Sequence, residues 1–219
     1  MSIVSPSSPL PVQDLALAPM PDVLAALRAG RPVLVLDDAD RENEADLVCA
    51  ADRITPEVMA LMIREGSGIV CLCIPPDTAS RLRLRPMVEV NRSRHATAFT
   101  QSIEASHGVS TGVSASDRVQ TIHCALRTTL ENCEIVSPGH VFPLIARAGG
   151  VLERQGHTEA AVDLARLAGL APAGVLCELM NPDGSMARGE QVAAFARSHG
   201  IRVTTVAAVV DWRRRHAAF

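Results

Sequence analysis

The densest group of chemically capable side chains lies in LDDADRENEADL, residues 36–47, which gathers six acidic residues and one arginine between two apolar runs. In an extended chain, alternate side chains share a face, so Glu42, Glu44 and Asp46 would point the same way. Arg41 would lie on the opposite face unless the loop bends. Converging carboxylates repel one another unless a cation offsets them, and Mg²⁺ binds carboxylate oxygens. The stretch indicates a divalent cation site, and a solvated acidic turn explains the same residues equally well.

A second candidate site lies in ERQGHTEAAVDLARLAGL, residues 153–170. Gly156 lets a ligand approach the backbone closely, and Thr158 is expected to cap the helix that follows. Free amides at a helix start, the Thr158 hydroxyl and the Arg154 guanidinium suit a phosphate group. The GK[ST] ending of the nucleotide-binding P-loop is absent. The pattern favours a phosphate-binding turn; an ordinary strand-to-helix turn, with His157 as an incidental residue, is the alternative.

Two further residues could transfer protons. Glu178 lies in GVLCELM, where strand alternation places it on the face of Leu176 and Met180, inside the fold. A carboxylate in that place is a candidate acid or base, and an edge-strand residue that faces water is the alternative. His140 follows the Pro-Gly turn of SPGHVFPL, and histidine exchanges protons near neutral pH. A single histidine is more often structural than catalytic. Taken alone, each of these four candidate sites is therefore only a weak indication of function.

Composition excludes several classes of protein. The chain has 219 residues, 47% hydrophobic content and a formal net charge of −3, which describes a globular protein without the basic excess of a nucleic-acid-binding domain. The basic runs RLRLRP and WRRRH lack interleaved aromatic residues. The opening residues do not form a convincing signal peptide, and no segment approaches the roughly 20 apolar residues of a membrane span. We therefore expect a cytoplasmic protein with no nucleic-acid or membrane partner.

The elements that must position these residues alternate between helix and strand. Residues 1–19 are rich in serine and proline and are predicted to form a flexible arm, and residues 20–219 to form one domain. The alternation favours a mixed β-sheet covered by helices, in an α+β or α/β domain. Helices are predicted over residues 21–30, 55–66, 115–126 (capped near Ser116), 157–170, 189–200 and the tail, and strands over 31–38, 47–52, 68–74, 98–105, 141–148, 174–180 and 201–206.

Together the motifs match one enzyme family. DDADRENEADL, GSGIVCLCI, ATAFTQSIEA, GVSTGVSASDR and the long block from SPGHVFPL to PDGSMAR occur in this order. From about Pro21 to its end, the chain closely resembles 3,4-dihydroxy-2-butanone 4-phosphate synthase of riboflavin biosynthesis. The resemblance implies an α+β fold and conversion of D-ribulose 5-phosphate to L-3,4-dihydroxy-2-butanone 4-phosphate and formate, by metal-assisted enolisation, dehydration, skeletal rearrangement and loss of formate. It also implies two Mg²⁺ ions per site, with Mn²⁺ as a substitute, and a homodimer with active sites near the interface.

The resemblance also implies roles for individual residues. Glu42 and His157 would be the protein ligands of the metal pair. His140 and Glu178 match the family's essential catalytic positions. The substrate would be bound by Arg41, Glu42, Asp46, Arg154, Gln155, Gly156, His157, Thr158 and Glu178, with Asp37, Cys71 and Thr111 lining the same pocket in less defined roles.

Departures from the family pattern are small. Ala45 and Ser110 stand where relatives often have glycine and threonine, and neither change removes a functional group from the implied site. Some relatives carry a GTP cyclohydrolase II domain after this one, which is not expected here because the sequence ends with VVDWRRRHAAF. Two rival interpretations are a metal-dependent phosphohydrolase and a catalytically silent sugar-phosphate-binding protein. The phosphohydrolase would release phosphate instead of formate, and the silent protein would release neither.

Overall fold

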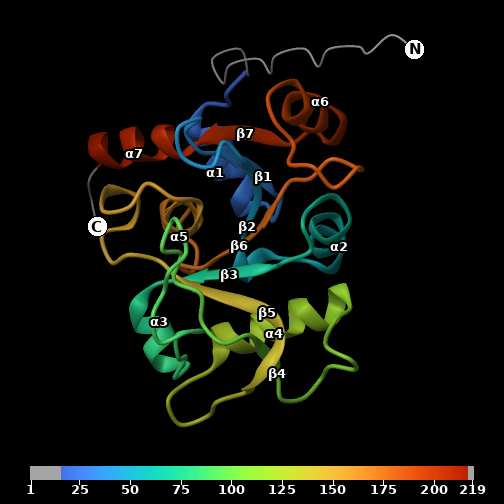
Figure 1. Cartoon of the computed structure of the whole chain (residues 1–219), viewed down its shortest axis with the longest axis vertical. Helices are drawn as coiled ribbons and strands as arrows, with labels where there is room; N and C mark the ends of the chain where they lie inside the picture. Colours follow the sequence, from blue (N-terminus) through green and yellow to red (C-terminus); the bar gives the residue numbers. More distant parts are fainter. Residues whose placement is uncertain (1–15, 217–219) are drawn as a thin grey trace.

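The computed structural model describes residues 16–216, so residues 1–15 of the predicted arm lie outside the described part of the chain. One sheet of seven strands crosses this part, in the order β4-β5-β3-β6-β2-β1-β7 (Figure 1). The β1–β7 and β3–β5 pairs are parallel, and the remaining neighbours are antiparallel. The strands are β1 Val33–Leu36, β2 Ala45–Ala50, β3 Cys71–Ile74, β4 Ile103–Ala105, β5 Ile135–Ile145, β6 Gly174–Glu178 and β7 Arg202–Thr205.

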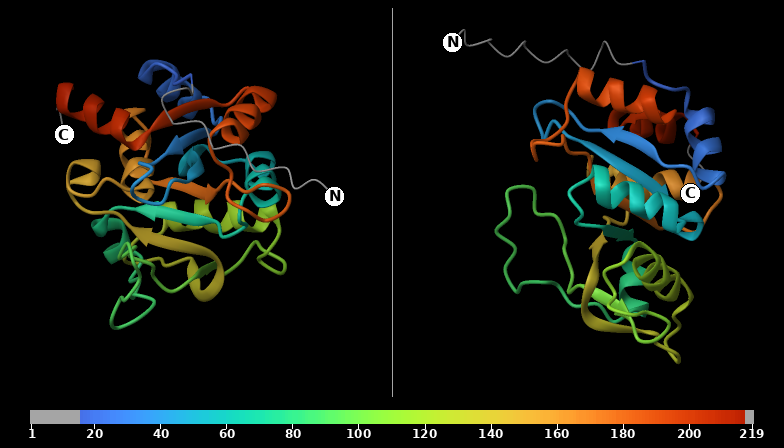
Figure 2. Two further views of the ribbon diagram at one scale, coloured as in Figure 1. Left: turned by 45° about the horizontal axis from the view of Figure 1, so that its top comes forward. Right: turned by 90° about the vertical axis from the view of Figure 1, so that its right-hand side faces the viewer.

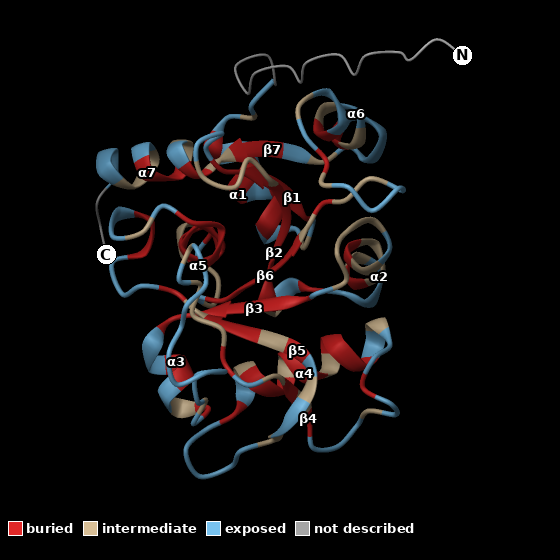
Figure 3. Cartoon of the chain, viewed as in Figure 1, coloured by how far each residue is buried: buried red, intermediate tan, exposed pale blue. Residues whose placement is uncertain are grey.

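Helices cover both faces of this sheet (Figures 1 and 2). Strand alternation divides the core into two clusters: Leu34 belongs to the cluster with α2, α4 and α6, while Val33 and Val35 pack with α1, α5 and α7. The central strands are buried and the outer helix faces are exposed (Figure 3). The helices are α1 Met20–Arg28, α2 Pro56–Glu65, α3 Pro76–Arg81, α4 Ala115–Arg127, α5 His157–Leu167, α6 Glu190–His199 and α7 Val206–Arg215, with short 3₁₀ turns η2 Ala51–Arg53 and η3 Gly150–Leu152.

The single mixed-sheet α+β domain confirms the predicted fold class. Thr55 caps α2, since its side chain accepts a hydrogen bond from the Val58 amide. The cap of α4 was predicted two residues too late: the Ser114 side chain accepts a hydrogen bond from the Asp117 amide, and Ser116 is already helical. The short helix α3 was not predicted, and none of the described helices is long and apolar enough to cross a membrane.

Candidate active site

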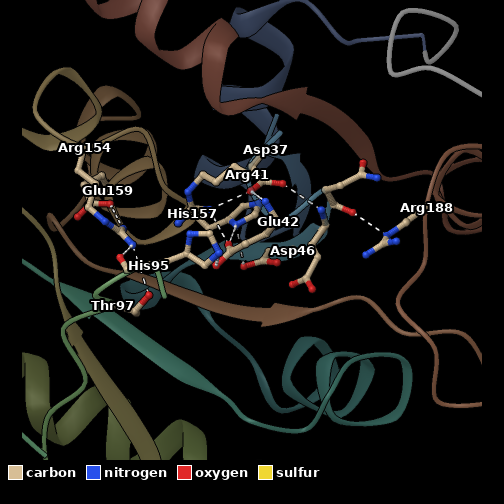
Figure 4. Close-up of polar contacts among 12 residues, drawn as sticks. Asp37, Arg41, Glu42, Asp46, His95, Thr97, Arg154, His157, Glu159 and Arg188 are labelled. Atoms are coloured by element: carbon tan, nitrogen blue, oxygen red, sulfur yellow. Dashed lines mark hydrogen bonds and ion pairs between the residues drawn. The ribbon is translucent and has the colours of Figure 1, made fainter. Parts of the chain in front are cut away.

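The acidic loop is folded around the carboxylate of Asp37, which directly follows β1. This buried carboxylate accepts hydrogen bonds from the amides of Glu42 and Glu44, at 3.0 and 2.9 Å, and from Nη1 of Arg41 at 2.9 Å. Asn43 has a positive φ of 55°, and its carbonyl accepts from Nε of Arg188 at 3.0 Å. The loop therefore bends, and Arg41 turns toward the carboxylates instead of away from them (Figure 4).

Sheet register and the start of α5 then bring distant residues together. The antiparallel pairing of β2 with β6 sets Asp46 directly beside Glu178. His157, the first residue of α5, places Nδ1 3.6 Å from Oε2 of Glu42 and 3.7 Å from Oδ2 of Asp46. These side chains surround a pocket of about 150 Å³, here called the acidic pocket, which is lined by Arg41, Glu42, Glu44, Asp46, Thr97, Phe99, Leu144, His157, Thr158, Leu176 and Glu178.

Charge and burial shift the ionisation of these groups in opposite directions. The His157 imidazole, with help from Arg41, lowers the pKa of Glu42 to about 2. Burial raises the pKa of Asp46, and the neighbouring acids Glu178 and Glu44 add to this rise. Burial acts to lower the pKa of His157, but the adjacent Asp46 and Glu42 outweigh it and raise that pKa. The pocket therefore concentrates negative charge in a place where water offsets it poorly.

The donor set fits a divalent cation. Ligand atoms of Asp37, Glu42 and His157 all lie within 4.8 Å of one another. With Mg–O distances of about 2.1 Å, two ligands of one Mg²⁺ lie roughly 3 to 4.2 Å apart, and the separations of 3.6 and 3.7 Å fall within that range. Nε2 of His157 and Oδ1 of Asp46 are buried without a hydrogen-bond partner among the described residues. Because Asp37 already accepts three hydrogen bonds, Glu42 and His157 are the more available ligands.

The predicted phosphate-binding turn is held by an ion pair between the partly exposed Arg154 and the buried Glu159. Nη1 of Arg154 bonds Oε2 of Glu159 at 2.6 Å, and Nη2 donates to the His95 carbonyl and the Thr97 hydroxyl. A Cβ on Gly156 would lie 2.4 Å from Nη1 of Arg154, so a larger residue there would displace this guanidinium from its present position. The turn is therefore packed closely and ties residues 95–97 to the edge of the pocket (Figure 4).

The expected cap of α5 was wrong. Gly156 occupies the N-cap position and makes no side-chain cap, while Thr158 lies within the first turn and lines the acidic pocket. The first amides of an α-helix have no partner within the helix, so this end still offers N–H donors to an anion.

His140 lies apart from the acidic pocket in this single chain. Its side chain is 46% exposed, and its Nδ1 and its amide both contact Oε2 of Glu104, at 2.9 and 2.8 Å. Gly112 packs against the same carboxylate so closely that a Cβ there would overlap Oε1 of Glu104. Thr111 precedes Gly112 and is exposed. We call Glu104, Thr111, Gly112 and His140 the histidine cluster.

The structure thus gathers only part of the predicted site. One pocket is lined by six of the predicted residues: Arg41, Glu42, Asp46, His157, Thr158 and Glu178. Asp37 and Arg154 support its walls. Cys71 is fully buried in β3, and Gln155 is exposed. The alternation of Glu42, Glu44 and Asp46 was predicted, but Glu44 was not included in the site. Four other lining residues lie within the quoted motifs but were not assigned to the site: Thr97, Phe99, Leu144 and Leu176. His95, whose Nε2 lies 3.9 Å from Oε1 of Glu42, lies in no quoted motif and was missed.

Comparisons with known proteins agree with this geometry. The family model described as 3,4-dihydroxy-2-butanone 4-phosphate synthase matches residues 21–212. A protein of that name from Pseudomonas putida is 62% identical over 87% of this chain and 88% of its own length. One from Bordetella bronchiseptica is 56% identical over 98% of this chain and 91% of its own length.

Solved structures with the same name superpose closely on this chain. One, in complex with two magnesium ions, has a TM-score of 0.85 and 39% identity, and the match covers 91% of this chain and 98% of that one. A two-domain synthase from A. baumannii has a TM-score of 0.85 and 43% identity over 90% of this chain, which spans 58% of that longer protein.

Proposed function

Because this chain belongs to the 3,4-dihydroxy-2-butanone 4-phosphate synthase family, we propose that the acidic pocket is its active site. The chain is a lyase of riboflavin biosynthesis, and it converts D-ribulose 5-phosphate to L-3,4-dihydroxy-2-butanone 4-phosphate and formate. One observation carries the assignment of the site: Glu42 after β1 and His157 at the start of α5, far apart in sequence, meet at 3.6 Å.

Glu42 and His157 are the proposed protein ligands of Mg²⁺, with Asp37 holding the loop that presents Glu42. Metal dependence is supported by the relative that binds two magnesium ions, and we extend the count of two ions, and substitution by Mn²⁺, to this chain. A bound cation supplies Lewis acidity that polarises the substrate carbonyl and makes the neighbouring C–H bond more acidic.

The remaining pocket residues bind and orient the substrate. In this proposal Thr158 and the first amides of α5 anchor the phosphate, while Arg154 and Gln155 shape the turn before them; the free amides of a helix start support this role. Arg41 and Asp46 face the same space and can hold the hydroxyl groups of the sugar. Fixing both ends of the ketose keeps its reactive carbons in one place through several steps.

Glu178 and His140 are the proposed proton-transfer residues. Enolisation requires removal of a proton from carbon beside the carbonyl, and dehydration requires a proton for the departing hydroxyl. After the skeletal rearrangement, water returns as formate is released, so substrate and products balance. Glu178 lines the pocket and contacts the substrate space directly, whereas His140 does not within one chain.

A second copy of the chain is proposed to supply the histidine cluster. Val113, which follows Gly112, and Val136, which pairs with Glu104 in the sheet, are 47% and 49% exposed, and exposed apolar side chains of this kind favour a protein interface. A homodimer with its active sites near the interface would bring His140 and Thr111 to the partner's pocket.

The domain boundary and the location are also proposals. The family match begins at residue 21, which supports a domain over residues 20–219. All six cysteines are unpaired and five of them are buried, which suits the reducing cytoplasm.

A formate assay tests the proposed function. Purified protein is supplied with D-ribulose 5-phosphate and MgCl₂, and formate and inorganic phosphate are both measured. We expect formate in equal amount to the substrate consumed, no phosphate, and loss of both substrate consumption and formate release after chelation. Phosphate without formate would indicate the phosphohydrolase, and neither product at saturating Mg²⁺ would indicate a silent binding protein.

A further inference from the structure

The turn between α2 and β3, residues 66–69, lies against the end of β6. The Ser67 amide donates to the Glu178 carbonyl at 2.9 Å, and the Met180 amide donates to the Glu65 carbonyl at 3.0 Å. Gly66 forms an antiparallel bridge with Leu179. These main-chain bonds alone hold Ser67 beside Glu178.

The hydroxyl of Ser67 is committed to the carboxylate of Glu178. Its Oγ lies 2.6 Å from Oε2 of Glu178 and accepts a hydrogen bond from the Ile69 amide at 3.1 Å. Because the hydroxyl accepts from the Ile69 amide, its own proton is available to be donated to Oε2 of Glu178. The Cys177 sulfur lies 3.4 Å from the same hydroxyl, and burial raises the pKa of this thiol to about 11, so it adds no negative charge at neutral pH.

The turn is also held from the side of α4. Nη1 of Arg118 donates to the Gly68 carbonyl at 2.8 Å, and its Nε donates to the Val113 carbonyl at 3.1 Å. Arg118 is buried, so this link is shielded from solvent. The serine is therefore presented by a turn whose backbone is fixed on both sides.

We propose that Ser67 is a positioning residue for catalysis, holding one carboxylate oxygen of Glu178 so that the other faces the substrate. This inference rests on the proposed proton-transfer role of Glu178. Ser67 does not line the acidic pocket, so it acts through Glu178 and not on the substrate. A carboxylate held by a short charge-assisted hydrogen bond keeps one rotamer, and proton transfer depends steeply on such orientation.

Ser67→Ala tests the proposal directly. Loss of a hydrogen bond to a charged group should lower kcat by about tenfold, while KM for ribulose 5-phosphate and the Mg²⁺ concentration for half-maximal rate stay within about twofold, because no ligand contact is removed. Ser67→Thr keeps the hydroxyl and should recover most of the rate. Ser80→Ala is the matched control, since Ser80 makes its hydrogen bond within α3, away from the pocket, and should leave kcat unchanged.

A double-mutant cycle separates this inference from the proposed function. If Ser67 acts through Glu178, Ser67→Ala should cause no further loss of kcat in a Glu178→Gln background. An equal tenfold loss in both backgrounds, or an unchanged kcat for Ser67→Ala alone, would overturn the positioning role. Wild-type formate release by Glu178→Gln would instead overturn the proposed role of Glu178 itself.

Discussion

The acidic pocket holds its charged side chains in the protein interior, whereas the histidine cluster presents its histidine to solvent. Asp46 and His157 are 2% and 5% exposed, and each has an opposite charge within the same chain. The side chain of His140 is 46% exposed, with Glu104 on one side. Both regions carry residues that the family resemblance assigns to one reaction, yet within a single chain they lie apart.

This difference indicates a division of labour. Buried charges must be offset locally, so a metal site is built from groups that fold together in one chain. An exposed histidine is solvated and needs no such local partner, so it can join an active site formed by the surface of a second subunit. If this division is correct, damage to the pocket should remove metal binding, and damage to the cluster should spare it.

Glu42→Ala should have the largest effect. Loss of a metal-binding carboxylate should reduce formate release by about a thousandfold or more. The same variant should lose thermal stabilisation by Mg²⁺, because a ligand stabilises only the folded state that binds it. Calorimetric melting with and without MgCl₂ measures this. His140→Asn is the control and should keep the full Mg²⁺ shift; if both variants lost it equally, the two regions would not be separable.

His140→Asn should reduce kcat by about a hundredfold, the usual scale for a general acid or base, with substrate binding still detectable. Mixing the His140→Asn protein with the Glu42→Ala protein tests whether His140 acts in the partner's site. Random exchange of subunits would give hybrid dimers with one intact site each, restoring about a quarter of the wild-type rate. Each variant alone is the control for this measurement. An unchanged kcat for His140→Asn would show that this residue does not transfer a proton in the reaction. If subunit exchange is demonstrated but the mixture recovers no activity, His140 acts in the site of its own chain.

Most helices and strands, and several of the residues that line the pocket, could be predicted from the sequence, because strand alternation and the residue types at helix ends are local patterns. Alternation correctly placed Glu178 on the face of Leu176, and both line the pocket. The register between strands depends instead on contacts between distant parts of the chain. Asp46 lies beside Glu178 because of how β2 pairs with β6, and no local pattern in the sequence indicates that pairing.

Loop bends were also beyond local reasoning. Arg41 turns inward because the carboxylate of Asp37 gathers amides from several residues ahead in the chain. The ion pair between Arg154 and Glu159 likewise depends on packing over Gly156. The family resemblance supplied His140 as a functional residue, but one sequence could not show that it would lie outside the pocket of its own chain.

Arg154→Ala should chiefly raise KM, by roughly tenfold, with a smaller change in kcat. The guanidinium holds both the turn before α5 and residues 95–97, so its loss should loosen the pocket wall nearest the proposed phosphate site. It also leaves buried Glu159 without its cation, which costs stability. Steady-state kinetics and thermal melting separate the two effects. The matched variant Arg154→Met with Glu159→Gln removes both charges, and it should regain stability while KM stays high; recovery of KM as well would show that Arg154 has no role in substrate binding.

Asp117→Asn should have the smallest effect, on the histidine cluster side of the comparison. The Asp117 carboxylate accepts hydrogen bonds from the Ser110 hydroxyl and amide and from the Gly112 amide, and these bonds lower its pKa. Because the pKa of this carboxyl is lower in the folded than in the unfolded protein, its ionisation stabilises the fold at pH values above the unfolded pKa of about 4. That stabilisation is lost as the pH falls through the lowered pKa of the folded state. The urea midpoint of the variant should therefore lie below that of the wild type at pH 7, and the gap should close between about pH 5 and pH 3.

Asp183→Asn is the matched control for this prediction, since Asp183 also has a lowered pKa through Ser185 but lies in a turn outside both regions. Both variants should show the same closing gap in urea midpoint as pH falls. Only Asp117→Asn should also slow formate release at neutral pH, by a few-fold, because the loop that it releases carries Thr111 and packs against Glu104, the partner of His140. Equal activity of the two variants would mean that the loop before α4 supports the fold but not the reaction, and the histidine cluster would then reduce to His140 and Glu104.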